Sequence, residues 1–298
     1  MNRRIIYLIN PISGTRDKEA LLNLIKKKTT ARNIPFEILP TVSSGDYSFL
    51  EAKIREENIT DIGICGGDGS VNQVVHSLAH TNINFGIIPM GSGNGLALTA
   101  SIPRNSEKAI DVLFDGTPIY IDAFRVNKQF ACMLCGLGFD AGVAHEFARQ
   151  PKRGLRTYAS LTTKKFFSAK PSLFLIEANK LSFSVDAFFI SVANSNQFGN
   201  NFTIAPKALL SDGLLDVVIV KKIAKPLLLF TVMRQVLTGQ LKKIENTLKS
   251  PVIYFQTPEL TISNLQNAPM HIDGEPRESE TALKIKILPN HFKLIHGW

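Results

Sequence analysis

The sequence predicts two domains: an α/β domain built on a parallel sheet, followed by a β-rich domain of antiparallel strands. The chain has 298 residues, and single cores stop growing at roughly 250 to 300 residues. Residues 1–122 alternate apolar runs with glycine-containing loops and helical patterns, whereas residues 123–298 consist mainly of strand-like runs. Alternating strands and helices favour a parallel sheet, and consecutive strands favour antiparallel pairing. The sequence also allows the last segment of the chain to return to the first domain.

The N-terminal domain repeats one plan, in which an apolar strand leads through a loop into a helix. We expect strands at residues 5–9, 35–41, 61–65 and 84–90, and a helix at 45–58. Crossover connections in a parallel sheet are right-handed, so the loops that follow the strands gather at the carboxyl edge of the sheet. The sequence therefore predicts that this edge carries the functional loops.

The C-terminal domain is predicted from short apolar runs bounded by turn residues. The expected strands are residues 130–138, 172–179, 181–194, 214–220, 252–256, 259–265 and 282–288, and the expected helices are residues 141–170 and 226–248. Such a run of strands is typical of antiparallel sheets that pack against each other.

Composition limits the partners and the compartment. The formal net charge is +9 and the pI is about 9.4, which suits an anionic partner such as a nucleotide or an acidic membrane. No zinc-finger spacing or RNA-binding aromatic signature is present, so no nucleic-acid partner is expected. The three cysteines form no disulfide framework and favour a reducing, cytoplasmic location. No apolar run approaches the roughly 20 residues of a membrane span, so we expect a soluble or peripheral protein.

Two glycine-rich loops each leave a predicted strand and open a predicted helix. They read GGDGSVNQ (residues 66–73) and GSGNGLAL (residues 91–98). Small residues let the backbone approach an anion, and the free N–H groups and dipole of the helix face it. Neither loop matches the dinucleotide or Walker fingerprints, which disfavours a dehydrogenase or a P-loop enzyme. The pattern predicts phosphate binding of another kind.

Six motifs occur in a fixed order that resembles the diacylglycerol kinase catalytic family, which includes bacterial lipid kinases and the sphingosine and ceramide kinases. They are NPISG (10–14), GGDGSVNQV (66–74), IIPMGSGNGLA (87–97), GLGFDA (136–141), SDGLLD (211–216) and HIDGEP (271–276). The resemblance implies a Rossmann-like N-terminal domain with a parallel sheet of the phosphofructokinase and NAD kinase type, and a C-terminal antiparallel sandwich. It also implies ATP- and Mg²⁺-dependent phosphorylation of a lipid hydroxyl, on diacylglycerol or a sphingoid base.

The resemblance assigns roles to individual residues. The implied nucleotide-binding set is Asn10, Pro11, Ser13, Gly14, Thr41, Gly66, Gly67, Asp68, Gly69, Ser70, Asn72, Gly91, Ser92, Gly93 and Asn94. The implied magnesium site comprises Asp212, the Leu214 carbonyl and the Leu209 position. The implied base is Glu275 or its neighbour Asp273, although in sphingosine-kinase-like members Asp68 takes that role. By the same resemblance Asp140 is a candidate for binding the lipid.

Other interpretations stay open at this point. An NAD kinase shares the GGDG turn and a related fold, but NPISG and GSGNG argue against it. A catalytically inactive, basic membrane-binding protein would lack carboxylates, whereas Asp68, Asp212, Asp273 and Glu275 are present. Asp-Gly is also a common hairpin turn, and an acid such as Asp140 can simply cap a helix. We expect a peripheral protein at the inner face of the membrane, and the sequence leaves homodimer formation open.

Overall fold

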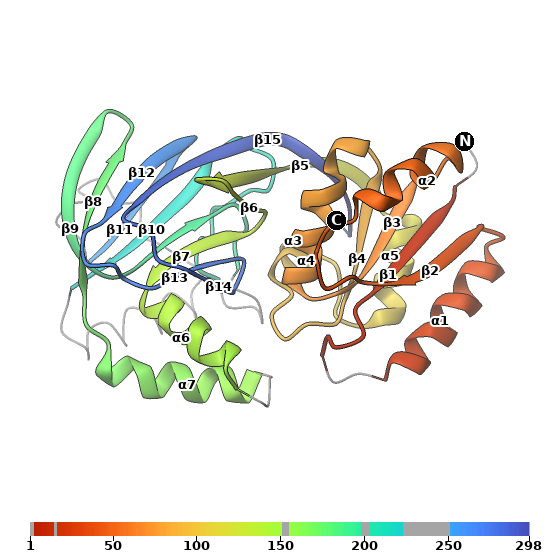
Figure 1. Ribbon diagram of the computed structural model, residues 1–298, viewed down its shortest axis with the longest axis horizontal. Coiled ribbons are helices and arrows are strands. Elements are labelled where there is room, and N and C mark those ends of the chain that lie inside the picture. The colour runs from red at the N-terminus through yellow and green to blue at the C-terminus, as the bar shows by residue number, and fades with distance from the viewer. Residues whose placement is uncertain (1–2, 15–16, 151–154, 198–202, 223–250, 298) are drawn as a thin grey trace. The chain divides into compact units, whose positions relative to one another are not determined.

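The computed structural model describes residues 3–14, 17–150, 155–197, 203–222 and 251–297. The chain divides into two compact units, whose elements are labelled in Figure 1. The first unit comprises residues 1–121 together with 290–298, and the second comprises residues 122–289. The C-terminal residues therefore belong to the first unit.

The first unit is an α/β unit, as the sequence predicts. Its parallel sheet has the strand order β2-β1-β3-β4, and the end of β15 adds to β4 in parallel through Lys293 and Leu294. The strands are β1 (Ile5–Ile9), β2 (Phe36–Pro40), β3 (Asp61–Gly66) and β4 (Asn84–Pro89). The helices are α1 (Lys18–Ala31), α2 (Glu51–Glu56), α3 (Asp68–Leu78), α4 (Gly95–Thr99) and α5 (Ser106–Asp115), with 3₁₀ turns at Ser48–Leu50 and Ala79–Thr81. Every residue of β1 and β3 is buried, which explains why both strands are apolar without alternation.

The helix predicted at 45–58 is shorter than expected. A 3₁₀ turn starts at Ser48, and the α-helix starts only at Glu51. Gly45 adopts a positive φ of 71°, and the Asp46 carboxylate accepts a hydrogen bond from the Ser48 N–H. These local bonds hold residues 45–48 in a turn, so the helix begins after them.

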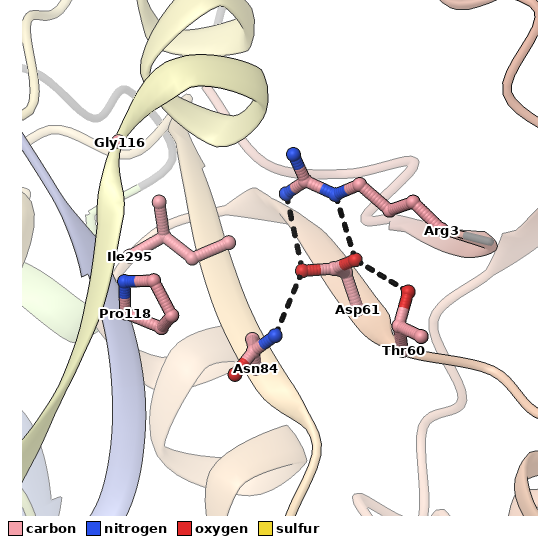
Figure 2. Close-up of a pocket in the computed structure, with 7 residues that line it drawn as sticks. All are labelled: Arg3, Thr60, Asp61, Asn84, Gly116, Pro118 and Ile295. Atoms are coloured by element: carbon pink, nitrogen blue, oxygen red, sulfur yellow. Dashed lines mark hydrogen bonds and ion pairs between the residues drawn. The ribbon is translucent and has the colours of Figure 1, made fainter. Parts of the chain in front are cut away.

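The amino ends of the parallel strands are tied together by a buried carboxylate. Asp61, at the first position of β3, lines a cavity of about 250 Å³ with Arg3, Thr60, Asn84, Gly116, Pro118 and Ile295 (Figure 2). Its Oδ1 and Oδ2 accept hydrogen bonds from the Arg3 guanidinium at 3.1 and 2.8 Å. Thr60 Oγ1 and Asn84 Nδ2 donate to the same carboxylate at 2.7 and 3.2 Å. Because these polar groups satisfy one another, we assign the cavity a structural role.

The second unit is β-rich and antiparallel, again as predicted. Its sheet has the order β14-β13-β7-β9-β8-β12-β15, and β10 pairs with β9 and β11. The strands are β5 (Thr117–Val126), which enters from the first unit, β6 (Gln129–Ala131), β7 (Leu134–Gly138), β8 (Ser172–Ala178), β9 (Leu181–Ala193), β10 (Leu215–Lys221), β11 (Val252–Thr257), β12 (Glu259–Asn264), β13 (Met270–Ile272), β14 (Glu275–Arg277) and β15 (Ala282–His296). The helices are α6 (Phe139–Ala148) and α7 (Leu155–Ser168). Alternate side chains of these strands form one apolar core that includes Phe124, Phe174 and Met270.

Two predicted elements of this unit are divided in the structure. The strand expected at 130–138 is interrupted at Cys132 and Met133, because their N–H groups bond to the side chain of Asp273 instead of to a neighbouring strand. The helix expected at 141–170 is two helices, α6 and α7. The helix expected at 226–248 lies outside the described residues. Within the part of the chain that the structure describes, no helix has the length and apolar character needed to cross a membrane.

Candidate active site

Three loops of the first unit follow β1, β3 and β4, so they leave the same edge of the parallel sheet. Asn10, just after β1, connects two of them: its Nδ2 donates to Ser70 Oγ at 2.8 Å. Its Oδ1 accepts the Ile12 N–H at 3.0 Å, which shapes the NPISG loop. Ser70 lies in the first turn of α3 and is buried. One amide therefore fixes the NPISG loop against the GGDGS loop.

Glycines let these loops approach each other backbone to backbone. A Cβ on Gly91 would lie 2.6 Å from the Gly67 Cα, and a Cβ on Gly67 would lie 3.1 Å from the Gly91 Cα. Gly14, at a positive φ of 64°, would bring a Cβ to 2.0 Å from the Met90 carbonyl oxygen. Side chains at these positions would force the loops apart, which is the physical reason for glycine here.

The GSGN loop after β4 is closed by its own asparagine. Asn94 is buried and adopts a left-handed φ of 57°. Its Oδ1 accepts the Gly91 N–H at 2.8 Å, and its Nδ2 donates to the Gly91 carbonyl at 2.7 Å. Asn tolerates this backbone conformation better than most residues. These two hydrogen bonds close the loop around Ser92 and Gly93, which are both half-buried.

The N-terminus of α3 suits an anion. Gly67 is the residue before the helix and offers no side chain to cap it. The first N–H groups of a helix lack intrahelical partners, and the helix dipole adds positive potential there. In the neighbouring NPISG loop, the Ser13 hydroxyl is buried and has no hydrogen-bond partner. A helix start without a side-chain cap and a buried hydroxyl without a partner fit the phosphates of a nucleotide.

The remaining predicted nucleotide residues surround this edge. Thr41 follows β2, and its N–H donates to the Ile9 carbonyl at 2.9 Å. Asp68 opens α3 and is half-buried, as are Gly69 and Asn72, whereas Gly66 ends β3 and Pro11 is exposed. The structure thus groups the predicted set, residue by residue, around the carboxyl ends of β1 to β4.

Two basic residues that contact these loops were not predicted from the sequence. The Lys18 ammonium donates to the Ser13 carbonyl, and Arg104 donates to the Gly93 carbonyl at 3.2 Å. Both bring positive charge to loops already suited to phosphate. Neither belongs to one of the six motifs, although their closeness in sequence to NPISG and GSGNG is a signal that could have found them.

In the second unit, the DG turn before β10 lies in an acidic cluster. Asp212 is exposed, and its Oδ1 accepts the Leu214 N–H at 3.0 Å. Buried Asp122 accepts the Gly213 N–H at 2.7 Å. Gln256 Nε2 lies 3.4 Å from Asp212 Oδ2 and 3.3 Å from Asp216 Oδ2. The sequence alone indicates no role for Asp122 or Asp216.

The environment of Asp216 is unusual for a carboxylate. It is fully buried on β10 and accepts a hydrogen bond from the Tyr254 hydroxyl. Burial raises the pKa of Asp216 to about 6, although the bonds from Tyr254 and Gln256 lower it. A nearby cation would relieve this cost by stabilising the ionised form. Asp122 and Asp216 are buried and Asp212 is exposed, so the three carboxylates place negative charge at the DG turn.

The donor set of the predicted magnesium site fits that ion. Mg²⁺ binds through one or two carboxylates with carbonyl oxygens and retained waters. The exposed carboxylate of Asp212 and the backbone at Leu209 and Leu214 offer such oxygens. No group of three or more His, Cys, Asp or Glu side chains with metal-binding geometry occurs among the described residues. Any magnesium here would thus depend on carbonyls and water for most of its ligands.

The DGE turn joins β13 to β14 and separates the two acids proposed as base. Asp273 is 4% exposed. Its carboxylate accepts the N–H groups of Cys132, Met133 and Leu134 at 2.9, 3.0 and 2.9 Å, and Cys132 Sγ lies 3.3 Å away. Glu275, at the first position of β14, is exposed. Asp273 is therefore committed to the backbone, whereas Glu275 is available to a substrate.

The predicted lipid residue Asp140 lies in the first turn of α6 and is buried. Its Oδ1 accepts the Ala141 N–H at 2.8 Å, and its Oδ2 lies 3.3 Å from His271 Nε2. In the sequence, His271 on β13 stands out only as the first residue of the HIDGEP motif. A histidine two residues before the DG turn was the signal available in the sequence.

Each half of the chain matches a known protein family. The family described as "Diacylglycerol kinase catalytic domain" matches residues 4–126, and the family described as "YegS C-terminal NAD kinase beta sandwich-like domain" matches residues 134–296. The diacylglycerol kinase of Bacillus subtilis (strain 168) is 28% identical over 279 residues, which cover 91% of this chain and 89% of that protein. The diacylglycerol kinase of Staphylococcus carnosus (strain TM300) is 24% identical over 282 residues, which cover 92% and 89%.

The fold is shared with a solved structure. A crystal structure of a diacylglycerol kinase from Bacillus anthracis strain Sterne aligns with a TM-score of 0.75 at 19% identity, covering 99% of this chain and 97% of that one. Both halves of the chain match their family over almost their full length, and the motifs of both halves lie where the structure brings polar groups together. The chain therefore belongs to the family of diacylglycerol kinases and YegS-like lipid kinases.

Proposed function

We propose that this protein is an ATP- and Mg²⁺-dependent lipid kinase that phosphorylates a hydroxyl group of diacylglycerol or a sphingoid base. One observation carries the proposal: the loops after β1, β3 and β4 are held together by the Asn10–Ser70 bond and by the Gly67–Gly91 approach. The start of α3 has no side-chain cap and the buried Ser13 hydroxyl has no hydrogen-bond partner, which suits both to phosphate oxygens. Family membership makes ATP the nucleotide that these loops would bind.

The first unit would bind and orient the nucleotide. Phosphoryl transfer depends mainly on positioning and on neutralising charge at the phosphates. The N-terminus of α3, Lys18 and Arg104 supply positive potential, and we assign Asp68 the role of organising the metal that accompanies ATP. When bound, Mg²⁺ would neutralise charge on the phosphate oxygens. We assign a second, structural magnesium to the DG turn with Asp212, Leu214 and Leu209.

The second unit would supply the base. A hydroxyl nucleophile needs a carboxylate that can take its proton. Asp273 already accepts hydrogen bonds from three backbone N–H groups, so we assign it the role of anchoring the turn. Exposed Glu275 is the carboxylate left for the proton. We place Asp140 beside the lipid site and propose that it acts through its contact with His271.

Product analysis tests the proposed reaction. The protein would be incubated with labelled ATP and Mg²⁺ and with diacylglycerols, sphingoid bases or ceramides in turn, with NAD as a further acceptor. We expect labelled phosphate on diacylglycerol or a sphingoid base only. Phosphorylation of NAD alone would identify an NAD kinase. If no acceptor received labelled phosphate but the protein still bound membranes, it would be an inactive membrane-binding protein.

Substitution of a loop glycine tests the nucleotide site. We expect Gly93→Val to raise KM for ATP by about tenfold, equivalent to about 1.4 kcal/mol of lost binding. A side chain at this position would keep the nucleotide from the backbone of the loop. Steady-state kinetics at varied ATP would measure this effect, and a circular dichroism melt would check folding. A folded Gly93→Val protein with normal ATP kinetics would count against the assignment of this loop.

Binding to vesicles tests the membrane partner. We propose that the protein acts as a peripheral protein at the inner face of the membrane, because its net charge is +9. Each Lys or Arg near an anionic surface contributes about 1 kcal/mol, screened over roughly 8 Å at physiological salt. Cosedimentation should therefore require phosphatidylglycerol and weaken as salt is raised. If the protein bound purely zwitterionic vesicles as well as vesicles that contain phosphatidylglycerol, this proposal would be wrong.

A further inference from the structure

A buried histidine and a buried aspartate meet behind the DGE turn. His271 is 2% exposed and Asp140 is 7% exposed, and His271 Nε2 lies 3.3 Å from Asp140 Oδ2. The two residues are 131 positions apart in sequence, and they come from β13 and from the first turn of α6. Buried polar groups cost free energy unless they are hydrogen-bonded, so this contact needs a reason.

The other ring nitrogen of His271 holds the turn itself. The Gly274 N–H donates to His271 Nδ1 at 3.3 Å. A backbone N–H can only donate, so Nδ1 must be the acceptor and carry no proton. In the neutral ring the proton then sits on Nε2, which donates to the Asp140 carboxylate. Asp140 thus selects the one tautomer that lets His271 bind the turn.

The chain leaves space for this pair at Gly136. In the sheet, Gly136 on β7 is directly opposite His271 on β13. A Cβ on Gly136 would lie 2.2 Å from Asp140 Oδ2 and 2.3 Å from His271 Nε2. Those are the two atoms of the contact, so any side chain at residue 136 would separate them. The φ of Gly136 is not in the left-handed region, so its backbone conformation does not require a glycine. The glycine is needed instead to make room for the contact between Asp140 and His271.

The turn that His271 binds is a tight hairpin that ends at Glu275. Asp273 and Gly274 have φ values of 49° and 82°, as in a two-residue hairpin turn with both central residues left-handed. The Asp273 carboxylate anchors one side of this turn to the backbone of residues 132–134. The Gly274 N–H anchors the other side through His271, next to the peptide that leads into Glu275.

We propose that His271 is a positioning residue, which together with Asp140 fixes the Gly274 peptide and thereby the placement of Glu275. The inference rests on the proposed function of Glu275 as the base. It gives buried Asp140 a role through His271 instead of direct contact with the lipid. Asp140 is held in place because Gly138, the residue before α6, has a φ of 92° and a Cβ there would lie 2.5 Å from the Phe188 carbonyl oxygen.

Two substitutions of His271 separate the two nitrogens. In His271→Asn, the side-chain oxygen can take the place of Nδ1 and accept the Gly274 N–H. In His271→Gln, the amide reaches toward Asp140 but offers no acceptor at the Nδ1 position. A displaced catalytic group can cost about 10²-fold in rate, so we expect kcat to fall about 10- to 100-fold in His271→Gln, with KM for ATP unchanged. His271→Asn should keep kcat within about threefold of wild type, because a correctly placed group retains its rate.

A glycine pair supplies a test that leaves both polar residues intact. Gly136→Ala should lower kcat as His271→Gln does, because its methyl group separates Asp140 from His271. Gly142→Ala, on α6, is the matched control, since its Cβ would meet only Pro269 Cγ at 3.9 Å. Wild-type kcat in folded Gly136→Ala would overturn the proposal. So would an Asp140→Asn protein in which only KM for the lipid rises, because Asp140 would then contact the lipid directly.

The tautomer can be measured without turnover. Long-range proton–nitrogen spectra of protein labelled at histidine, assigned with His271→Asn, should show a proton on Nε2 of His271 and none on Nδ1. Gly136→Ala should weaken that preference, whereas an Nδ1–H tautomer in wild type would contradict the proposal. A wild-type protein that phosphorylates no lipid but shows the Nε2–H form would contradict the proposed function alone, because this readout needs no substrate.

Discussion

Glu275→Gln is expected to lower kcat by about 10²- to 10⁴-fold, the range for loss of a general base. Glutamine has nearly the same shape but cannot take a proton from the lipid hydroxyl. Since the base acts in the chemical step, KM for ATP and the Mg²⁺ dependence should stay near wild type. The acidic limb of the pH–rate profile should also disappear, because that limb reports protonation of the base.

The matched control is Glu278→Gln. Glu278 is exposed and follows β14 by one residue, so the same chemical change is made beside the turn. We expect its kcat and pH profile to match wild type. A comparable loss in Glu278→Gln would mean that negative charge in this region matters and that Glu275 holds no special role.

Asp68→Asn distinguishes the two assignments of the base. If Asp68 organises Mg²⁺ and ATP at the start of α3, the variant should need more Mg²⁺ or ATP and keep the acidic limb of its profile. If the Asp68 variant loses the acidic limb at unchanged Mg²⁺ dependence while Glu275→Gln keeps it, the roles are reversed. The enzyme would then work as the sphingosine-kinase-like members do.

The largest effect on stability is expected for Asp61→Ala, with a loss of about 3 to 5 kcal/mol in the free energy of unfolding. Asp61 is 1% exposed. Its removal leaves the Arg3 guanidinium, Thr60 Oγ1 and Asn84 Nδ2 without their shared acceptor (Figure 2). Urea denaturation followed by circular dichroism would measure the change in the free energy of unfolding. The substitution alters none of the residues that we assign to the nucleotide, the metal or the base.

Glu259→Ala is the control for this prediction. Glu259 pairs with Lys286 at 3.3 Å, but the side chains are 65% and 71% exposed. Exposed ion pairs contribute about 0 to 1 kcal/mol, so the unfolding free energy should change by no more than that. Equal losses in Asp61→Ala and Glu259→Ala would contradict the view that the buried carboxylate ties the strands together.

The sequence by itself determined the features that depend on neighbouring residues. The apolar runs of β1, β3 and β4 indicated buried parallel strands, and the glycines that follow β3 and β4 indicated loops that approach a phosphate. Asp273-Gly274 indicated a hairpin turn, which both φ values confirm. Each of these signals lies within a few residues, where backbone sterics and hydrogen bonding act directly.

Only the tertiary structure decided which of these residues serve the fold and which are free. Asp273 and Glu275 are alike in sequence, yet Asp273 is bonded to N–H groups about 140 positions away, with separations of 139 to 141 residues. The contact of His271 with Asp140 likewise joins β13 to α6. No local pattern encodes such contacts, because they arise when sheet pairing brings β7 beside β13 and leaves room for two side chains over a glycine.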